Sequence, residues 1–402
     1  MDRKTISIPT ANDAFDALLT AADSAARPGL LLVPETLGLN PQVQELADLY
    51  AEEGYLVLVP DLFRKTGGST EATCGRDKQP DIDRAIADAA AAASALRANS
   101  ACDGKVAAIG WGLGVTVACS AAARAPLDAA VAYCPPALDQ QLDTLKSIAC
   151  PVVFHFAAED ALVPAETRAS VKQALATKDD AEVYVYPGTG RDFSDGRENG
   201  FRRGAASLAH SRTMSLLRRE IGPRYDLEAL WERHLEREFV TCDADAAIST
   251  MVAHPYVNHV PTMIGGLGRE QLHRYYKHHF IPQARGTRMI PLSRTVGVDR
   301  VVDEFVLCFR HDTPNDTLLP GIEPTGRYVE LPMVAIVQFR GDKLCAERLY
   351  WDQASLMVQI GLLEPTQYPV TGAEAAASVQ DENVPLNTLR AAAWWRKSEG
   401  RT

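Results

Sequence analysis

Hydrophobic runs alternate with amphipathic segments along the first half of the chain, up to about Pro223. The hydrophobic runs predict strands at 29–35, 55–61, 105–112, 127–134, 150–160 and 181–188. The segments between them predict helices, of which the clearest are 41–53, 80–98 and 166–176. Continuous Val, Ile and Leu strands separated by helices are typical of a mostly parallel sheet that is covered on both faces. We therefore predict a doubly wound α/β domain over residues 1–222.

The pattern changes after Gly222-Pro223. Helical stretches are predicted at 227–239, 246–253 and 269–279, and long alternating runs follow at 287–298, 300–311, 326–339 and 343–351. Helices followed by turn-linked alternating strands indicate an α+β domain with an antiparallel sheet. We assign this second domain to residues 223–370. Periodicity is lost over 371–402, which we interpret as a C-terminal tail.

Composition limits the classes of function. The chain has 402 residues, of which 46% are hydrophobic and 23% charged, as expected for two globular domains. Its net charge of −11 disfavours nucleic acid as a partner. No signal sequence and no run of about 18 hydrophobic residues is found, so we expect a cytoplasmic protein without a membrane partner. The 8 cysteines form no paired motif, which predicts reduced thiols.

The segment AAIGWGLGVTVAC (107–119) has the strand-turn-helix form of a nucleophile elbow. Gly112 stands at the middle position, where the nucleophile is expected. The three glycines of this segment form GxGxG rather than GxGxxG, and no acidic residue ends the next strand. A dinucleotide site needs both features, so we disfavour it.

Three further segments carry a resemblance to the dienelactone hydrolase family of α/β-hydrolases: VPETLGLN (33–40), VPDLF (59–63) and FHFAAEDALVP (154–164). The resemblance implies a triad of Cys, His and Asp, with a Glu that controls the thiol. On this chain the Asp is Asp160 and the Glu is Glu35, but Gly112 stands at the position of the Cys and Arg191 at that of the His. We interpret these four residues as a vestigial hydrolase site.

The chemistry of these residue types leaves three hypotheses for the first domain. Glycine has no nucleophile and a permanently charged arginine is no base, so the domain is expected to be an inactive scaffold. Arg191 could instead hold an anionic ligand beside Glu35 or the amides of the elbow. The third hypothesis is ester or lactone hydrolysis by an unusual route through Glu35, Asp160 or Cys134.

The second domain resembles the SnoaL-like members of the nuclear transport factor 2 superfamily over residues 227–365. The likeness is carried by YVNHVPTMIGGLGREQL (256–272) and PTGRYVELPMVAIVQFRGDKLCAERLYWDQASLMVQIGLL (324–363). It implies a cone-shaped, curved antiparallel sheet around an apolar cavity. Asp352 falls at the position of the catalytic Asp of SnoaL-like cyclases, and His259 falls where a histidine enters the cavity.

We therefore predict a cofactor-free acid/base enzyme of isomerase, cyclase, lyase or hydratase type, acting on a medium-sized apolar carbonyl compound. Asp352 would move the proton and His259 would orient the oxygen. Candidate substrate-binding residues are Tyr256, Arg294, Glu304 and Trp351. Two simpler roles stay open: Asp352 could cap the following segment or pair with an arginine, and His259 could be a hydrogen-bonded core residue. A non-catalytic ligand-binding or assembly protein is a further alternative.

The histidines beyond residue 230 give no metal motif. The pairs 254/259 and 273/278 are five residues apart, whereas a helical zinc pair is spaced i,i+4, and there is no HExxH. We therefore expect no metal and no cofactor. The resemblance to the superfamily also implies a homodimer.

Overall fold

The computed structural model describes residues 1–10, 13–23, 25–35, 38–62, 81–136, 138–284, 286–389 and 396–400. By their internal contacts they form two compact units, Met1–Arg224 and Tyr225–Thr402. We call them unit 1 and unit 2.

Unit 1 is built around an eight-stranded sheet. Its strands are β1 (Asp2–Pro9), β2 (Ala14–Ala21), β3 (Arg27–Val33), β4 (Leu56–Pro60), β5 (Cys102–Trp111), β6 (Ala129–Tyr133), β7 (Val152–Ala157) and β8 (Ala181–Tyr186). Their order across the sheet is β1-β2-β4-β3-β5-β6-β7-β8. All neighbours from β4 to β8 are parallel, whereas β1 and β2 pair antiparallel at one edge. The predicted α/β-hydrolase-like domain with a mainly parallel sheet is confirmed.

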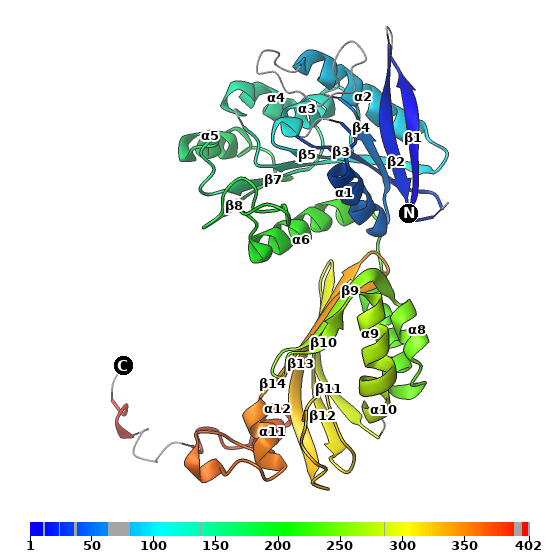
Figure 1. Cartoon of the computed structure of the whole chain (residues 1–402). Helices are drawn as coiled ribbons and strands as arrows, with labels where there is room; N and C mark the ends of the chain where they lie inside the picture. Colours follow the sequence, from blue (N-terminus) through cyan, green and yellow to red (C-terminus); the bar gives the residue numbers. More distant parts are fainter. Residues whose placement is uncertain are drawn as a thin grey trace. The chain divides into compact units, whose positions relative to one another are not determined.

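Helices cover both faces of this sheet (Figure 1). They are α1 (Pro41–Glu52), α2 (Ile82–Ala98), α3 (Leu113–Ala122), α4 (Leu142–Ser147), α5 (Ala165–Ala174) and α6 (Arg203–Glu220), with a short 3-10 turn at Leu138–Gln141. Helices α1 and α6 lie on one face, and α2, α3 and α4 lie on the other. Asp81 is the N-cap of the alanine-rich α2 and accepts a hydrogen bond from the Arg84 amide at 3.0 Å. The helix buries Ala85, Ala89 and Ala92 along one stripe.

The sequence pattern missed β1 and β2. Strand β1 is an edge strand in which only Ile8 is buried, so its hydrophobic alternation is short and weak. Because an edge strand needs few buried side chains, its pairing with β2 decides its conformation rather than a local hydrophobic pattern.

Unit 2 contains a six-stranded, mainly antiparallel sheet. Its strands are β9 (Met251–His259), β10 (Ile264–Leu267), β11 (Arg288–Val296), β12 (Arg300–Arg310), β13 (Tyr328–Arg340) and β14 (Lys343–Trp351). Their order is β10-β9-β14-β13-β12-β11, and only β14 and β9 pair parallel. The predicted helix at 246–253 was wrong in its second half, because β9 begins at Met251. The sequence of β9 contains a proline and an asparagine, which are rare in strands, so no local pattern predicts it. Pairing with β14 decides its conformation.

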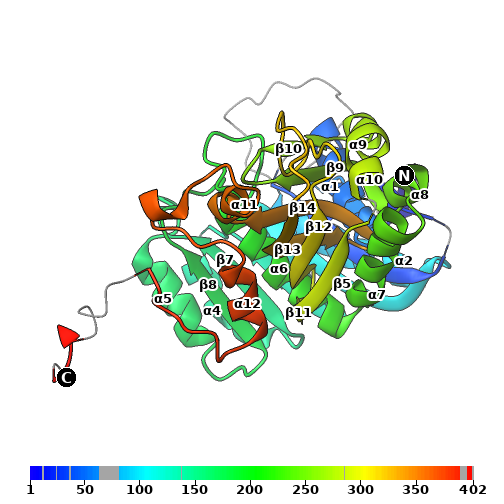
Figure 2. The ribbon, with the colours of Figure 1, turned by 90° about the horizontal axis from the view of Figure 1, so that it is seen from below.

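The helices of unit 2 are α7 (Leu227–Leu235), α8 (Ala244–Ser249), α9 (Arg269–Tyr275), α10 (Ile281–Ala284), α11 (Gln353–Gln359) and α12 (Glu374–Gln380), with a 3-10 turn at Pro365–Gln367. Helices α7 and α9 each continue into a single π-helical turn, Glu236–Val240 and Tyr276–Phe280. Helices α7 to α10 gather on one face of the sheet, and α12 lies on the other (Figure 2). Ala376 of α12 is buried against Val306 and Cys308, so part of the predicted tail packs on unit 2.

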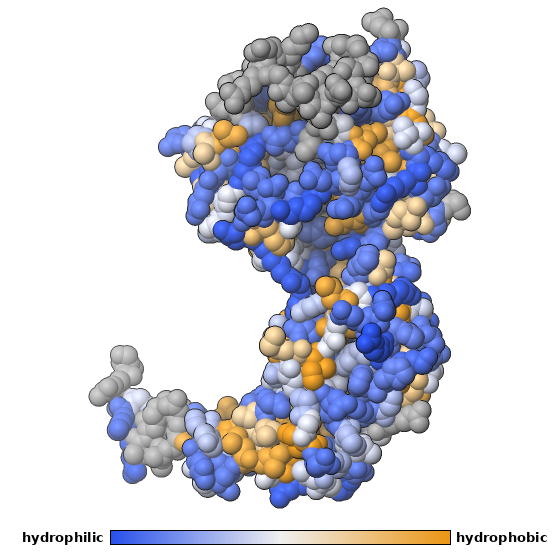
Figure 3. Space-filling view, viewed as in Figure 1, coloured by the Kyte–Doolittle hydropathy of each residue, from blue (hydrophilic) through white to orange (hydrophobic). Residues whose placement is uncertain are grey.

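Hydrophobic side chains reach the surface of unit 2 around α11 and α12, as the space-filling view shows (Figure 3). Leu362 and Val379 are 53% and 42% exposed in this part of the chain. Within the described residues, no helix combines the length and the hydrophobicity that crossing a membrane requires.

Candidate functional site

The strand order of unit 1 puts a topological switch point at the carboxyl ends of β3 and β5. The chain passes from β3 to β4 on one side and then returns to β5 on the other side, so these two neighbours mark a topological switch point. Connections that leave in opposite directions open a crevice at such a point, where open α/β sheets bind ligands. Glu35 follows β3 and Gly112 follows β5.

Gly112 forms a tight turn between β5 and α3. Its backbone angles are φ +51° and ψ −121°, a region that glycine adopts without strain but that costs energy for other residues. Its amide donates to the Tyr133 carbonyl at 2.9 Å. A Cβ atom added here would lie 2.0 Å from Glu35 Oε2 and 2.7 Å from Arg191 Nη2. Glu35 and Arg191 therefore occupy the space into which a side chain at the elbow would point.

Three charged side chains from three different strand ends form a continuous ion-pair chain. Arg191, which follows β8, donates through Nη2 to Glu35 Oε1 at 2.9 Å and to Oε2 at 3.2 Å. Its Nη1 lies 3.3 Å from Oδ2 of Asp160, which follows β7. The side chain of Asp160 is 2% exposed and that of Glu35 is 47% exposed. Glu35 is therefore the carboxylate of this group that solvent and a substrate can reach.

The charges of these three side chains disfavour the predicted role of Arg191 in binding an anionic ligand. Burial acts to lower the pKa of Arg191, but Glu35 and then Asp160 act in the opposite direction and leave that pKa raised. One guanidinium between two carboxylates gives the group a net negative charge. An anionic ligand would have to displace Glu35 from Arg191, so the hypothesis of an anion pocket at Arg191 loses its support.

Cys134 lies at the end of β6, near the ion-pair chain but buried. It is 4% exposed and has a positive φ of 46°. Burial raises the pKa of its thiol to about 12, and the nearby Asp160 adds to this effect. Because the thiolate is the reactive form, a thiol with such a pKa is a poor nucleophile at neutral pH.

In unit 2, His259 lines an apolar cavity together with Phe280, Phe305 and Leu349, among other residues. It is 3% exposed, and its Nδ1 donates to the Ile264 carbonyl at 3.2 Å. Burial lowers the pKa of the imidazole to about 4, although the bond to Ile264 acts against this. His259 is therefore a neutral, hydrogen-bonded residue at physiological pH.

Asp352 caps helix α11. Its Oδ1 accepts from the Ala354 amide at 2.9 Å, and its Oδ2 accepts from the Ser355 hydroxyl at 2.8 Å. Both carboxylate oxygens thus have local partners at a helix N-terminus. The described residues that line the cavity include His259 but not Asp352. The structure therefore does not assemble these two residues at one cavity wall.

The residues predicted to bind substrate are held in separate contacts. The ring of Tyr256 lies 5.4 Å from the guanidinium carbon of Arg348. Glu304 accepts from the Ser293 hydroxyl at 2.7 Å. Trp351 donates through its indole nitrogen to a glutamine of α11 at 2.6 Å. None of these three residues is among the described residues that line the cavity.

Arg294 is the centre of an ion-pair network in unit 2. It bonds both carboxylate oxygens of Asp303, at 2.9 and 3.1 Å. Its Nη1 also bonds Glu232 at 3.1 Å and Glu228 at 3.2 Å. The bond to Asp303 is the largest influence that raises the pKa of Arg294. With three carboxylates around it, Arg294 joins β11 to β12 and α7.

Unit 2 contains a second group of ionisable residues, which the sequence analysis missed because it compared only the spacings between histidines. His234, Glu238 and Glu347 are all buried, and their ligand-type atoms lie within 4.8 Å of one another. A local signal existed, because His234 and Glu238 have the i,i+4 spacing of a helix face. The third member comes from β14, more than a hundred residues later in the chain.

Known proteins match unit 1. The sequence profile of the dienelactone hydrolase family matches residues 15–221. The carboxymethylenebutenolidase of Pseudomonas putida is 26% identical over 213 residues, which are 50% of this chain and 90% of that protein. A candidate carboxymethylenebutenolidase of Azospirillum brasilense is 30% identical over 233 residues, which are 54% of this chain and 99% of that protein.

Solved structures match the same half of the chain. A candidate dienelactone hydrolase from Klebsiella pneumoniae has 23% identity and a TM-score of 0.48, and the match covers 54% of this chain and 97% of that one. A dienelactone hydrolase-like promiscuous phosphotriesterase from metagenomic libraries has 25% identity and a TM-score of 0.49, with 55% and 99% covered.

The strand order and the elbow at the end of β5 define unit 1 as an α/β-hydrolase-type domain. The family profile covers half of the chain, so the chain belongs to the dienelactone hydrolase family. This corrects the predicted function. The relatives are hydrolases that match residues of unit 1, and nothing supports an isomerase, cyclase, lyase or hydratase in unit 2 with unit 1 as a mere scaffold or ligand pocket.

Proposed function

We propose that unit 1 hydrolyses a small ester or lactone at the strand-end crevice, with Glu35 acting on the reacting group above Gly112. The observation that carries the proposal is the position of the Glu35 carboxylate, 2.0 Å from where a Cβ atom of the elbow residue would lie. The carboxylate thus fills the place from which a side-chain nucleophile would attack in an α/β-hydrolase. We propose that Gly112 itself supplies no nucleophile.

Accessibility supports Glu35 over the two other candidates. The Asp160 side chain is 2% exposed, so its carboxylate cannot meet a substrate without rearrangement. Cys134 is also buried, and its pKa of about 12 keeps the thiol protonated. Glu35 is about half exposed and is held in one orientation by two bonds from Arg191. Asp160 and Arg191 are therefore positioning residues in this proposal.

The chemical steps need only water and the chain itself. Glu35 accepts a proton from a water molecule as the water oxygen attacks the acyl carbon. The negative charge that develops on the carbonyl oxygen is stabilised at the N-terminus of α3, where the Leu113 amide begins the helix. The bond from the acyl carbon to the ring or ester oxygen then breaks, and that oxygen takes the proton from Glu35. The products are a carboxylic acid and a hydroxyl group.

The substrate class follows from the relatives. Proteins named carboxymethylenebutenolidase act on a butenolide, which is an unsaturated lactone, that carries a carboxymethylene group. We propose a lactone or activated ester of similar size for this chain. The net negative charge of the Glu35, Arg191 and Asp160 group disfavours a substrate carboxylate directly beside Arg191. We therefore expect uncharged esters to be hydrolysed better than acidic ones.

The proposal is tested with the purified full chain and a panel of p-nitrophenyl esters and lactones. Glu35→Gln is expected to lower kcat by about 10²–10⁴-fold, the usual contribution of a positioned general base. Cys134→Ser should leave kcat unchanged. Glu45→Gln is the matched control, because Glu45 is an exposed carboxylate in unit 1 whose partner, Arg197, lies 3.6 Å away. Equal rates for wild type and Glu35→Gln would refute the proposal, as would a wild type without turnover.

Labelled water separates two roles for Glu35. If Glu35 activates water, a single turnover in H₂¹⁸O puts ¹⁸O into the acid product and leaves Glu35 unlabelled. If Glu35 attacks the acyl carbon directly and water then opens the resulting anhydride at the Glu35 carbonyl carbon, the first turnover puts an unlabelled oxygen into the product and ¹⁸O into Glu35. Mass spectrometry of the product and of the peptide containing Glu35 measures both, and the second result would replace the water mechanism.

We also propose that unit 2 has the cone-shaped fold of SnoaL-like domains. The support is its six-stranded mixed sheet, the helices α7 to α10 on one face, and the apolar cavity between them lined by Phe239, Phe280 and Met333. This proposal concerns the fold and assigns no reaction to unit 2. A crystal structure of the full chain with a flat sheet and no enclosed cavity would refute it.

A further inference from the structure

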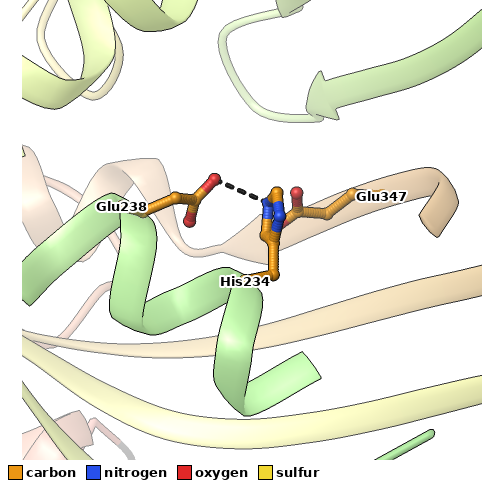
Figure 4. A group of neighbouring side chains, drawn as sticks. All are labelled: His234, Glu238 and Glu347. Atoms are coloured by element: carbon orange, nitrogen blue, oxygen red, sulfur yellow. Dashed lines mark ion pairs between the residues drawn. The ribbon is translucent and has the colours of Figure 1, made fainter. Parts of the chain in front are cut away.

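A buried cluster in unit 2 brings a histidine and two glutamates together. His234 comes from α7, Glu238 from the π-helical turn that follows it, and Glu347 from β14. Figure 4 shows the three side chains pointing toward one another. The residues are 0%, 2% and 4% exposed. Ionisable groups at this depth are normally paired or bound to a metal, because burying an uncompensated charge is costly.

Hydrogen bonds determine which nitrogen of His234 faces the carboxylates. The Thr250 hydroxyl donates its proton to the Ala247 carbonyl at 2.6 Å, so its oxygen accepts from Nδ1 of His234, also at 2.6 Å. Nδ1 therefore carries the proton in a neutral imidazole. Nε2 then directs a lone pair toward Glu238 Oε1, 2.9 Å away. Two lone pairs at this distance repel each other, so either a proton, which makes the contact an ion pair, or a metal ion lies between the two atoms.

The carboxylates have few partners outside the cluster. Within the described part of the chain, Oε1 of Glu238 is buried without a hydrogen bond, and its charged neighbour is His234 Nε2 at ion-pair distance. The Tyr276 hydroxyl lies 3.5 Å from His234 Nε2 and brings no charge at neutral pH. One divalent cation would balance two carboxylates and a neutral imidazole.

We propose that His234, Glu238 and Glu347 bind one divalent first-row transition-metal ion, of which Zn²⁺ and Mn²⁺ are the representative probes. One nitrogen and two carboxylate oxygens form a ligand set that such ions accept, at bond lengths of about 2.0–2.2 Å. The ligand atoms, now within 4.8 Å of one another, need only small side-chain rotations to meet one ion.

The surroundings of the cluster fit a metal ligand. Thr250 fixes the His234 tautomer that leaves Nε2 free, which is the usual function of a residue bonded to the second nitrogen of a metal-binding histidine. Trp231 stacks on the imidazole with ring centres 5.7 Å apart and so restrains its rotation. The π-helical turn Glu236–Val240 sets the position of Glu238, and π turns often occur at functional sites. At this depth the ion would stabilise unit 2.

The test uses the full chain, freed of metal by a chelator and then dialysed against Zn²⁺ or Mn²⁺. Wild type is expected to retain about one ion per chain by mass spectrometry of the elements, and its melting temperature should rise by several degrees. Glu347→Gln and Glu238→Gln, two nearly isosteric changes, should each lose the ion and the rise. Glu53→Gln is the matched control, because Glu53 is a buried glutamate of unit 1 that pairs with Arg218. It should retain the ion whatever its own stability.

X-ray absorption of wild type loaded with Zn²⁺ gives a readout that does not require a variant to fold. A first shell of nitrogen and oxygen that includes one imidazole is expected. The proposal is overturned if loaded wild type retains no ion and keeps its melting temperature, or if both glutamine variants retain as much ion as wild type. Sulfur in the first shell would also overturn it, because it would assign the ion to cysteines. The inference does not rest on the hydrolysis proposed for unit 1, so either can fail alone.

Discussion

The space above the elbow can be tested by adding a single methyl group, in the variant Gly112→Ala. The new Cβ atom would lie 2.0 Å from Glu35 Oε2 and 2.7 Å from Arg191 Nη2. The carboxylate of Glu35 is at the end of a flexible side chain. We therefore expect it to move away and to lose its hydrogen bonds to Arg191. Arg191 would keep its contact with Asp160.

The cost has two parts. The positive φ of 51° costs alanine about 1–2 kcal/mol more than glycine. Loss of the pair between Glu35 and Arg191 adds no more than about 1 kcal/mol, because the Glu35 side chain is 47% exposed and water screens the interaction. We therefore expect Gly112→Ala to lower the free energy of unfolding of unit 1 by about 2–3 kcal/mol.

A control and a double-mutant cycle separate these parts. Gly188 has a φ of 66° and no atom within 4 Å of an added Cβ, so Gly188→Ala measures the cost of a positive φ without a steric obstacle. In a Glu35→Ala background the nearer obstacle is absent and only Arg191 Nη2, 2.7 Å away, remains, so Gly112→Ala should cost less there than in wild type.

The assay is urea unfolding followed by hydrogen exchange of peptides from β5 and α3, because these peptides report on unit 1 alone. The hydrolytic rate is measured on the same samples and should fall, since Glu35 is displaced. The reasoning is refuted if Gly112→Ala costs no more than Gly188→Ala, or if its cost is the same with and without the Glu35 side chain.

Three further predictions follow from the other residues. Asp352→Ala should destabilise unit 2 by about 0.5–2 kcal/mol, because alanine removes the N-cap of α11. Asp352→Asn should cost less, because asparagine can still cap the helix, and equal melting temperatures for the two variants would contradict this. The folded-state pKa of His259, about 4, lies below the ordinary value of 6.5, so the unfolded chain binds more protons between these values and stability falls as pH drops through this window. We expect a loss of about 2 kcal/mol between pH 7 and pH 5 that is absent in His259→Gln, measured by urea unfolding at both pH values. A thiol reagent should modify the partly exposed Cys102 and Cys242 well before Cys134, as followed by peptide mass spectrometry, and early modification of Cys134 would contradict its pKa of about 12.

The sequence alone determined most of the architecture of unit 1. Six of its eight strands and its family follow from local features: continuous hydrophobic runs, helical segments between them, and short motifs at strand ends. The turn at Gly112 was also predicted from the sequence, because a strand, a glycine and a helix in direct succession define an elbow. Strands β1, β2, β9 and β10 were missed, because their conformation depends on pairing with distant strands.

Only the tertiary structure decided what the candidate residues do. Glu35 and Arg191 are 156 positions apart in the chain, and their contact arises because β3 and β8 end at the same edge of one sheet. From the sequence, Glu35, Asp160 and Cys134 were alternative routes for hydrolysis, whereas burial leaves Glu35 as the one of the three that solvent reaches. The group of His234, Glu238 and Glu347 likewise forms where α7 packs near β14. Exposure, ion pairing and pKa depend on the atoms that surround a side chain, and those atoms come from segments far away in the sequence, so local patterns could name the residue types but not their surroundings.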